Sequence, residues 1–98
     1  MVTYYPRVRK RNRRIQDQLE RAVEGIGDAL AEGRGRATER DFANFLTTAI
    51  SSTNEVEHNL EKCLDYGILD EGEHASLAAD TIEVRKMLIG LRRTVRGD

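Results

Sequence analysis

The first third of the chain has hydrophobic residues at every third or fourth position. These residues are Ile15, Leu19, Ala22, Val23, Ile26, Ala29 and Leu30. The spacing places them on one face of a helix and predicts an α-helix over residues 6–32. Pro6 suits the first turn of that helix, where its missing N–H costs nothing. Gly33 and Gly35 are expected to end the helix by adopting the left-handed conformation.

Two further glycines, Gly25 and Gly27, lie inside this predicted helix. Each costs about 1 kcal/mol relative to alanine at an interior position. They imply either a bend in the helix or a close approach by another backbone.

A second hydrophobic stripe predicts a helix over residues 39–66. Its members are Phe42, Phe45, Leu46, Ala49, Thr53, Val56, Leu60, Cys63, Leu64 and Tyr66. Thr38 and Asp41 resemble a capping box at the start of this helix, and Gly67 is a stop signal after its end.

A third helix is predicted over residues 71–96, with Asp70 and Glu73 as its N-terminal cap. It carries two hydrophobic stripes. The first consists of Leu77, Thr81, Val84, Leu88, Leu91 and Val95, and the second of Ala78, Ile82 and Ile89. A three-helix monomer does not readily cover both sides of such a helix. We therefore expect the second stripe to contact another subunit or a partner protein.

Three helices of roughly 40 Å each, joined by short connectors, predict neighbours that pack antiparallel. The fold class is thus an all-α, up-and-down helical bundle. It forms a single domain over residues 1–98, with residues 1–5 as a short N-terminal extension.

The composition excludes several classes of protein. Hydrophobic residues make up 39% of the chain and charged residues 34%, and no apolar run approaches the roughly 20 residues that span a bilayer. No apolar segment follows the basic N-terminal residues, as it would in a secretory signal. The single cysteine, Cys63, excludes an internal disulfide and fits a reducing compartment. We expect a cytoplasmic protein without membrane contact.

Catalytic and metal sites are not expected either. His58 and His74 lack partners at metal-ligand spacing, and Cys63 falls on a hydrophobic stripe, as a core residue would. Nothing indicates a base beside a serine or cysteine nucleophile. The sequence predicts a non-enzymatic protein with no cofactor.

Although the net charge is only −1, basic residues gather in two places. The first group lies at the start of the first helix and comprises Arg7, Arg9, Lys10, Arg11, Arg13 and Arg14. In an antiparallel bundle it lies beside an acidic turn that contains Asp65, Asp70, Glu71 and Glu73. The group either pairs with this turn or binds phosphates. For the second function the candidates are Arg9, Arg11 and Arg13.

The second basic group lies at the opposite end of the predicted bundle. It comprises Arg34, Arg36, Arg40, Arg92, Arg93 and Arg96. Arginines in the last turn of a helix suit its dipole, so a stabilising role is sufficient for the last three. Arg34 and Arg36 lie in a glycine-flanked turn that resembles a phosphate site, without the Gly-Lys-Ser/Thr of a P-loop. The group is either structural or anion-binding.

From Ile15 onward the sequence resembles a four-helix-bundle family first found encoded in intervening sequences of 23S ribosomal RNA genes. This family includes the accessory variability determinant of diversity-generating retroelements. The resemblance rests on the segments 18–22, 31–36, 66–69 and 86–91, with Phe42, Phe45, Leu46, Ala49, Ser52 and Glu55 between them. The Glu-Gly-x-Gly-Arg turn, which begins at Glu32, is the most distinctive of these pieces. The resemblance implies that the three helices correspond to the last three of the family's bundle and that the family's first helix is absent.

The resemblance implies a homo-oligomer, a pentamer in known members, with no established catalytic residues. It marks Glu32, Gly33, Gly35, Ser52 and Glu55 as structural positions. Of these, the polar side chains are expected to form a buried network or a subunit contact rather than to perform acid–base chemistry.

The function implied is that of a homo-oligomeric scaffold or accessory protein that associates with nucleic acid or a ribonucleoprotein. One such complex is that of a retroelement reverse transcriptase. The alternative is a protein-interaction subunit whose apolar groove binds a partner helix and which has no nucleic-acid role.

Overall fold

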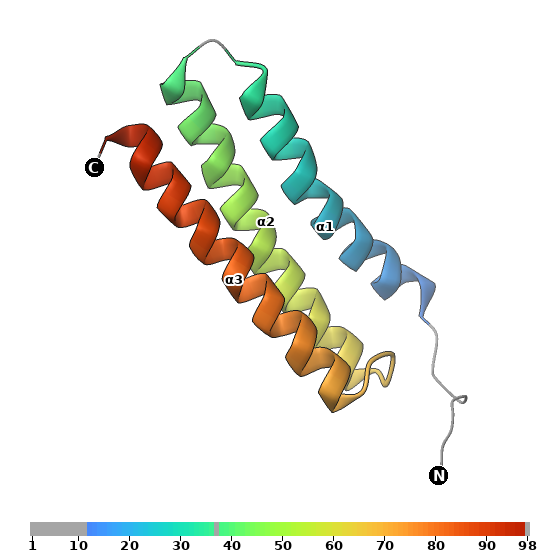
Figure 1. Cartoon of the computed structure of the whole chain (residues 1–98). Helices are drawn as coiled ribbons and strands as arrows, with labels where there is room; N and C mark the ends of the chain where they lie inside the picture. Colours follow the sequence, from blue (N-terminus) through green and yellow to red (C-terminus); the bar gives the residue numbers. More distant parts are fainter. Residues whose placement is uncertain (1–11, 37, 98) are drawn as a thin grey trace.

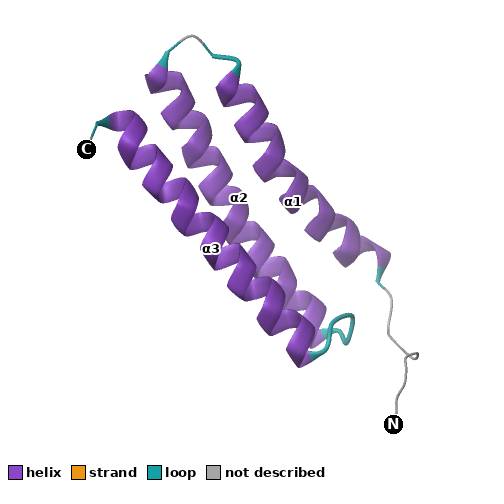
Figure 2. Ribbon diagram, viewed as in Figure 1, coloured by secondary structure: helices purple, strands orange, loops and turns teal. Residues whose placement is uncertain are grey.

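The computed structural model describes residues 12–36 and 38–97. It contains the helices α1 (Arg13–Arg34), α2 (Glu39–Asp65) and α3 (Glu71–Arg96), and no strand occurs in these two segments. The helices run up, down and up again (Figures 1 and 2). The prediction of an all-α antiparallel bundle of three long helices is confirmed.

The predicted start of the first helix at Pro6 is wrong. Asn12 has an extended backbone, with φ −144° and ψ 98°, so a continuous helix cannot run through it. The Ile15 N–H donates to Asn12 Oδ1 at 3.2 Å, and this N-terminal cap fixes the start of α1 at Arg13. Residues 1–11, with the predicted extension, lie outside the described part of the chain.

The first helix also ends differently from the prediction. It continues to Arg34, and Gly35 follows with φ −84°, which is right-handed rather than left-handed. The Gly35 N–H donates to the Glu32 carbonyl at 3.2 Å, and the Arg36 N–H donates to the Gly33 carbonyl at 3.1 Å. These short-range bonds satisfy the last carbonyls without a left-handed residue.

The turn between α2 and α3 agrees with its sequence signals. Gly67 is left-handed, with φ 75°. Its N–H donates to the Leu64 carbonyl at 3.1 Å, and the Ile68 N–H donates to the Cys63 carbonyl at 2.8 Å. This is the Schellman arrangement, and it includes the expected apolar contact, because Ile68 packs with Cys63.

The predicted N-terminal caps of α2 and α3 are both present. Thr38 Oγ1 accepts from the Asp41 N–H at 3.1 Å. Asp70 and Glu73 form a full capping box, in which each side chain accepts from the other residue's N–H, at 2.7 and 3.0 Å.

The core runs along α2, which lies between the other two helices (Figure 1). No Cα atom of α1 comes within 8 Å of one in α3, although both helices are fully described. Two helices across the diagonal of a four-helix bundle have this relation. Three clusters of buried side chains follow the length of α2, and its members in them are Leu46, Ala49, Val56, Leu60 and Cys63.

The two interior glycines of α1 differ in their surroundings. A Cβ added at Gly25 would lie 3.1 Å from Ser52 Oγ on α2, whereas a Cβ at Gly27 would meet nothing within 4 Å. A close approach does occur at Gly25, but the Ser52 side chain makes it rather than the predicted backbone. The described helices include none with the length and apolarity needed to cross a membrane.

Candidate nucleic-acid interface

The second basic group of the sequence is brought together at one end of the bundle. The end of α1, the start of α2 and the end of α3 lie at this end (Figure 1). We name as the arginine end the residues Arg34, Arg36, Arg40, Arg92, Arg93 and Arg96. Among the described residues, the carboxylates that flank these arginines in the chain are Glu32, Glu39 and Asp41.

Two of these arginines have structural partners. Arg36 Nη2 donates to Glu32 at 3.3 Å, and its guanidinium lies 5.1 Å from the centre of the Phe45 ring. Arg92 Nη1 donates to Thr47 Oγ1 at 3.0 Å. Their geometry therefore accounts for both residues within the fold.

The other four have no such partner in the described part of the chain. No described residue makes a side-chain hydrogen bond, ion pair or ring contact with Arg34, Arg40, Arg93 or Arg96, and all four are exposed. Arg40 from α2 and Arg96 from α3 line one cavity of about 450 Å³, together with Glu39. An exposed guanidinium group that is not already paired can bind a phosphate through two parallel hydrogen bonds.

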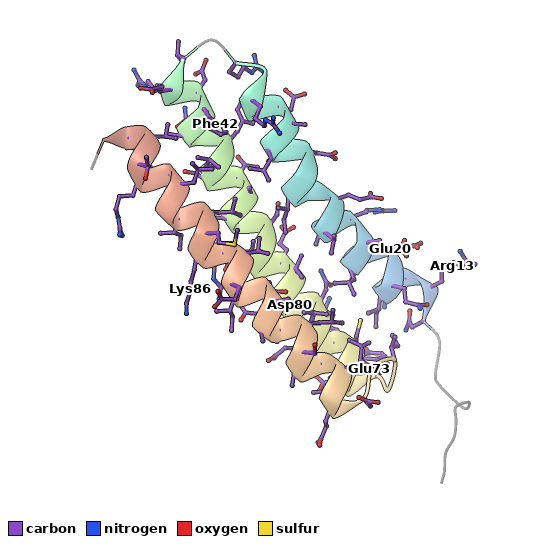
Figure 3. The ribbon with its side chains drawn as sticks, viewed as in Figure 1. Arg13, Glu20, Phe42, Glu73, Asp80 and Lys86 are labelled. Carbon is purple, nitrogen blue, oxygen red and sulfur yellow. The ribbon has the colours of Figure 1, made fainter. Side chains whose placement is uncertain are left out.

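The first basic group is described only in part. Arg9 and Arg11 lie outside the described residues. Arg13 is exposed and points away from the other helices (Figure 3). No ion pair between described residues links Arg13 to Asp65 or Asp70 of the acidic turn. Both interpretations of this group stay predictions.

The Glu-Gly-x-Gly-Arg turn allows the end of α1 to pack closely against α2. A Cβ added at Gly33 would lie 2.8 Å from Phe42 Cδ1 and 2.9 Å from Phe45 Cβ, closer than real contacts allow. Figure 3 labels Phe42 on α2. Gly33 is buried, and Glu32 and Arg36, on either side of the turn, form an ion pair. The position requires glycine because α2 lies against it.

The remaining polar family positions do not form a buried network within this chain. Glu32 and Glu55 are exposed, and Ser52 is half-buried against Gly25. The helices separate these positions, because Glu32 lies at the end of α1 whereas Ser52 and Glu55 lie near the middle of α2. A subunit contact stays a prediction for them.

The predicted interface stripe of α3 is half-buried at Ala78, Ile82 and Ile89. The most exposed apolar side chains of this helix belong largely to the other stripe, of which only Thr81 and Leu88 are buried. Its exposed members are Leu77, Val84 and Leu91, and Met87, which belongs to neither stripe, is exposed as well. Both sides of α3 thus retain apolar surface, as the pattern predicted.

Sequence reasoning missed a polar bridge between α2 and α3. Arg85 Nη1 donates to Glu57 at 2.8 Å and to Asn54 Oδ1 at 2.9 Å. The hydrogen bond from Arg85 lowers the pKa of Glu57. These partners are 28 and 31 residues apart in the chain, so no local pattern marks them.

The predictions on cysteine and metal chemistry can be compared with the described residues. Cys63 is a core side chain, 1% exposed, and its burial raises the pKa of the thiol. Within residues 12–36 and 38–97, no three His, Cys, Asp or Glu side chains are grouped as metal ligands would be.

Comparison with known proteins gives one family. The model of the family described as 23S rRNA-intervening sequence protein matches residues 3–90. No curated protein and no solved structure gives a significant match. The family match includes all of α1 and α2 and most of α3, with the Glu-Gly-x-Gly-Arg turn between them. The chain therefore belongs to the 23S rRNA-intervening sequence protein family.

Proposed function

We propose that this protein is a non-enzymatic, homo-oligomeric helical scaffold of the cytoplasm that associates with nucleic acid or a ribonucleoprotein. The main observation that supports this proposal is the arginine end, where Arg34, Arg40, Arg93 and Arg96 have no partner among the described residues. Arg40 lies in the first turn of α2, where a positive charge opposes the helix dipole, so stabilisation of its own helix does not account for it. A reverse transcriptase complex is one ribonucleoprotein of this kind.

Oligomer formation would strengthen this interface. Phosphate affinity grows with each contact that neutralises a charge and releases counterions. A ring of subunits, five in the proposed assembly, would repeat the arginine end around its axis. The exposed apolar residues Leu77, Val84 and Leu91 recur every seven positions on α3, a spacing that forms one stripe suited to packing against another helix.

The nucleic-acid role is tested by the salt dependence of binding to a structured RNA. We expect binding at about 50 mM salt that weakens steeply as salt rises, because counterions are released. Replacing Arg34, Arg40 and Arg96 with alanine removes up to three phosphate contacts. The slope of log K against log salt should then fall by about 2–3.

Two controls accompany that measurement. Lys86→Ala removes an exposed positive charge from the middle of α3 and should leave the slope unchanged. Circular dichroism must show equal helicity in all variants. A wild-type protein without salt-sensitive binding near 50 mM would contradict the nucleic-acid role.

The homo-oligomer is tested by sedimentation equilibrium. A stable species of 11.1 kDa at micromolar concentration would contradict it. Val84→Glu and Ile82→Glu place a charge on the two different sides of α3, and a charge buried without a partner is costly. The variant that dissociates identifies the interface, and the predicted stripe requires that Ile82→Glu do so.

A second candidate function is a subunit that binds a helix of another protein and has no nucleic-acid role. The exposed stripe of α3 favours it, since an amphipathic helix can bury such a surface. The two candidates differ in one outcome, because only the first requires salt-sensitive binding that depends on the arginine end.

A further inference from the structure

A groove of about 530 Å³ lies between α1 and α2, away from the arginine end. The residues that line it are polar or charged except for one alanine, and their aliphatic parts also face the groove. The residues are Gln18, Arg21, Ala22, Asn54, Glu55, His58, Asn59 and Lys62. We name it the α1–α2 groove. Three carboxamides and two permanent cations in one concave surface suit a ligand that has both a hydrogen-bonding edge and a negative charge.

A second hollow of about 350 Å³ adjoins this groove. It shares Gln18 and Arg21 with the groove and adds Arg13, Arg14 and Asp17. The two hollows together contain four permanent cations against the carboxylates of Asp17 and Glu55. A negatively charged chain can therefore follow the surface from the groove toward the start of α1.

Asn59 is the buried polar residue of the groove, with a relative exposure of 8%. Its Nδ2 donates to the Glu55 carbonyl at 3.0 Å, whereas no described residue donates to its Oδ1. Buried polar groups normally have partners. Because Asn59 lines the groove, a ligand there can donate to this oxygen.

The two cations of the groove are held differently. Lys62 Nζ donates to Gln18 Oε1 at the long distance of 3.5 Å, a weak bond that a phosphate can replace. Arg21 is exposed and has no polar partner among the described residues. The Glu55 carboxylate is an acceptor beside them, so it repels a phosphate but attracts an amino group of a base.

We propose that the α1–α2 groove binds one nucleotide of a single-stranded nucleic acid, with the phosphate at Arg21 and Lys62. The base is one with an exocyclic amino group, which donates to Glu55 while another donor of the base or sugar reaches Asn59. Unstacked bases read in this way are typical of single-strand recognition. The inference rests on the proposed function in that its ligand is a nucleic acid, but it uses no residue of the arginine end.

The experiment is a titration of the full-length protein with mononucleotides, followed by NMR of the side-chain NH₂ groups. Cytidine and uridine 5′-monophosphate are the matched pair, because the first has an amino group where the second has a carbonyl. We expect saturable shifts of the Asn59 and Gln18 NH₂ signals with both. The cytidine nucleotide should bind about tenfold more tightly, which is the usual size of discrimination by one good base contact.

Three variants test the assignment of roles. Arg21→Ala and Lys62→Ala should each weaken both nucleotides about tenfold, the loss typical of a charge-assisted hydrogen bond. Glu55→Ala should bring the ratio of the two affinities close to one. Glu61→Ala is its control, since it removes the same charge from an exposed position of α2 outside the groove lining, and it should leave the ratio unchanged.

Several outcomes would overturn the proposal. They are the absence of saturable shifts at Asn59 and Gln18, equal affinity for the two nucleotides, and equal shifts with inorganic phosphate alone. The Arg34, Arg40 and Arg96 variant separates this proposal from the proposed function. It should titrate like the wild type here even though its binding to structured RNA depends less steeply on salt.

Discussion

Both α1 and α3 contribute to the hydrophobic clusters along α2, but α1 also approaches α2 closely at two glycines, whereas long polar side chains bridge α2 and α3. On the first interface, Gly25 lies against Ser52, and Gly33 lies against Phe42. The single side-chain hydrogen bond between described residues of α1 and α2 is the 3.5 Å contact from Lys62 to Gln18.

On the second interface, Arg85 reaches Glu57 and Asn54, and Arg92 reaches Thr47. α3 has only Thr81 and Leu88 buried, whereas α1 buries four residues. Steric fit therefore positions α1, and polar bridges contribute more to the position of α3. An interface of the second kind leaves apolar surface of α3 free for another subunit, and an interface of the first kind tolerates little change in volume.

The largest expected effect is that of Gly33→Ala on the α1–α2 interface. The new Cβ would lie within 3.0 Å of Phe42 and of the Phe45 Cβ, so the two helices must separate. Overpacking of this kind costs about 1–3 kcal/mol, of which the higher helix propensity of alanine returns up to about 1 kcal/mol. Urea denaturation at one fixed protein concentration should show a net loss of unfolding free energy of about 1–2 kcal/mol.

Gly27→Ala is the matched control for that variant. It makes the same change on the same helix, at a position with nothing within 4 Å. We expect a gain in stability of about 0.5–1 kcal/mol. If both variants changed stability equally, steric fit would not be what positions α1.

The second prediction concerns the polar bridge to α3. Arg85→Ala removes hydrogen bonds to Glu57 and Asn54 from a side chain that is 22% exposed. We expect a loss of about 1 kcal/mol, between the values for surface ion pairs and for buried charged hydrogen bonds. Lys86→Ala is the control, because its pair with Glu83 is exposed and 3.8 Å long, and it should change stability by less than about 0.5 kcal/mol.

The sequence predicted those features that depend on neighbouring residues. The caps at Thr38 and Asp70 and the stop at Gly67 follow from side-chain and backbone chemistry within a few positions. The prediction misplaces the start of α1 because it depends on Pro6, although Asn12 is a better capping residue. The α2–α3 bridge and the α1–α2 groove could not be predicted, because they depend on the register of helices that lie far apart in the chain.

The candidate site was predicted in part for the same reason. The convergence of the arginines at one end follows from antiparallel helices of similar length alone. That Arg36 contacts Phe45, and Arg92 contacts Thr47, depends on side-chain geometry. Sequence could not separate these two arginines from the four that have no side-chain partner among residues 12–36 and 38–97.

The third prediction uses a double-mutant cycle between Gly25 and Ser52, which lie against each other near the middles of α1 and α2. Gly25→Ala alone should be nearly neutral, since a Cβ 3.1 Å from Ser52 Oγ offsets the gain in helix propensity. In a Ser52→Ala background that oxygen is gone, and the nearest remaining Ser52 atom is the Cβ at 3.7 Å, an ordinary contact. Gly25→Ala should then stabilise the protein by about 0.5–1 kcal/mol. Additive effects in the cycle would show that the two positions do not interact.

The smallest expected effect is a pH dependence that belongs to the second interface alone. The hydrogen bond from Arg85 lowers the pKa of Glu57 in the folded protein. The stability from this pair is therefore complete above the unfolded pKa of glutamate, about 4.3, and is lost as the pH falls through the lower, folded pKa. Glu57 is 38% exposed, so solvent screening limits the effect to a few tenths of a kcal/mol. The measurement is the difference in urea midpoint between the wild type and Glu57→Gln. The other carboxylates are present in both proteins, so their contributions to the pH dependence cancel in this difference. This difference should favour the wild type at pH 7 and shrink as the pH falls below the unfolded pKa of glutamate. A difference that stayed constant with pH would show that the pair adds no charge-dependent stability.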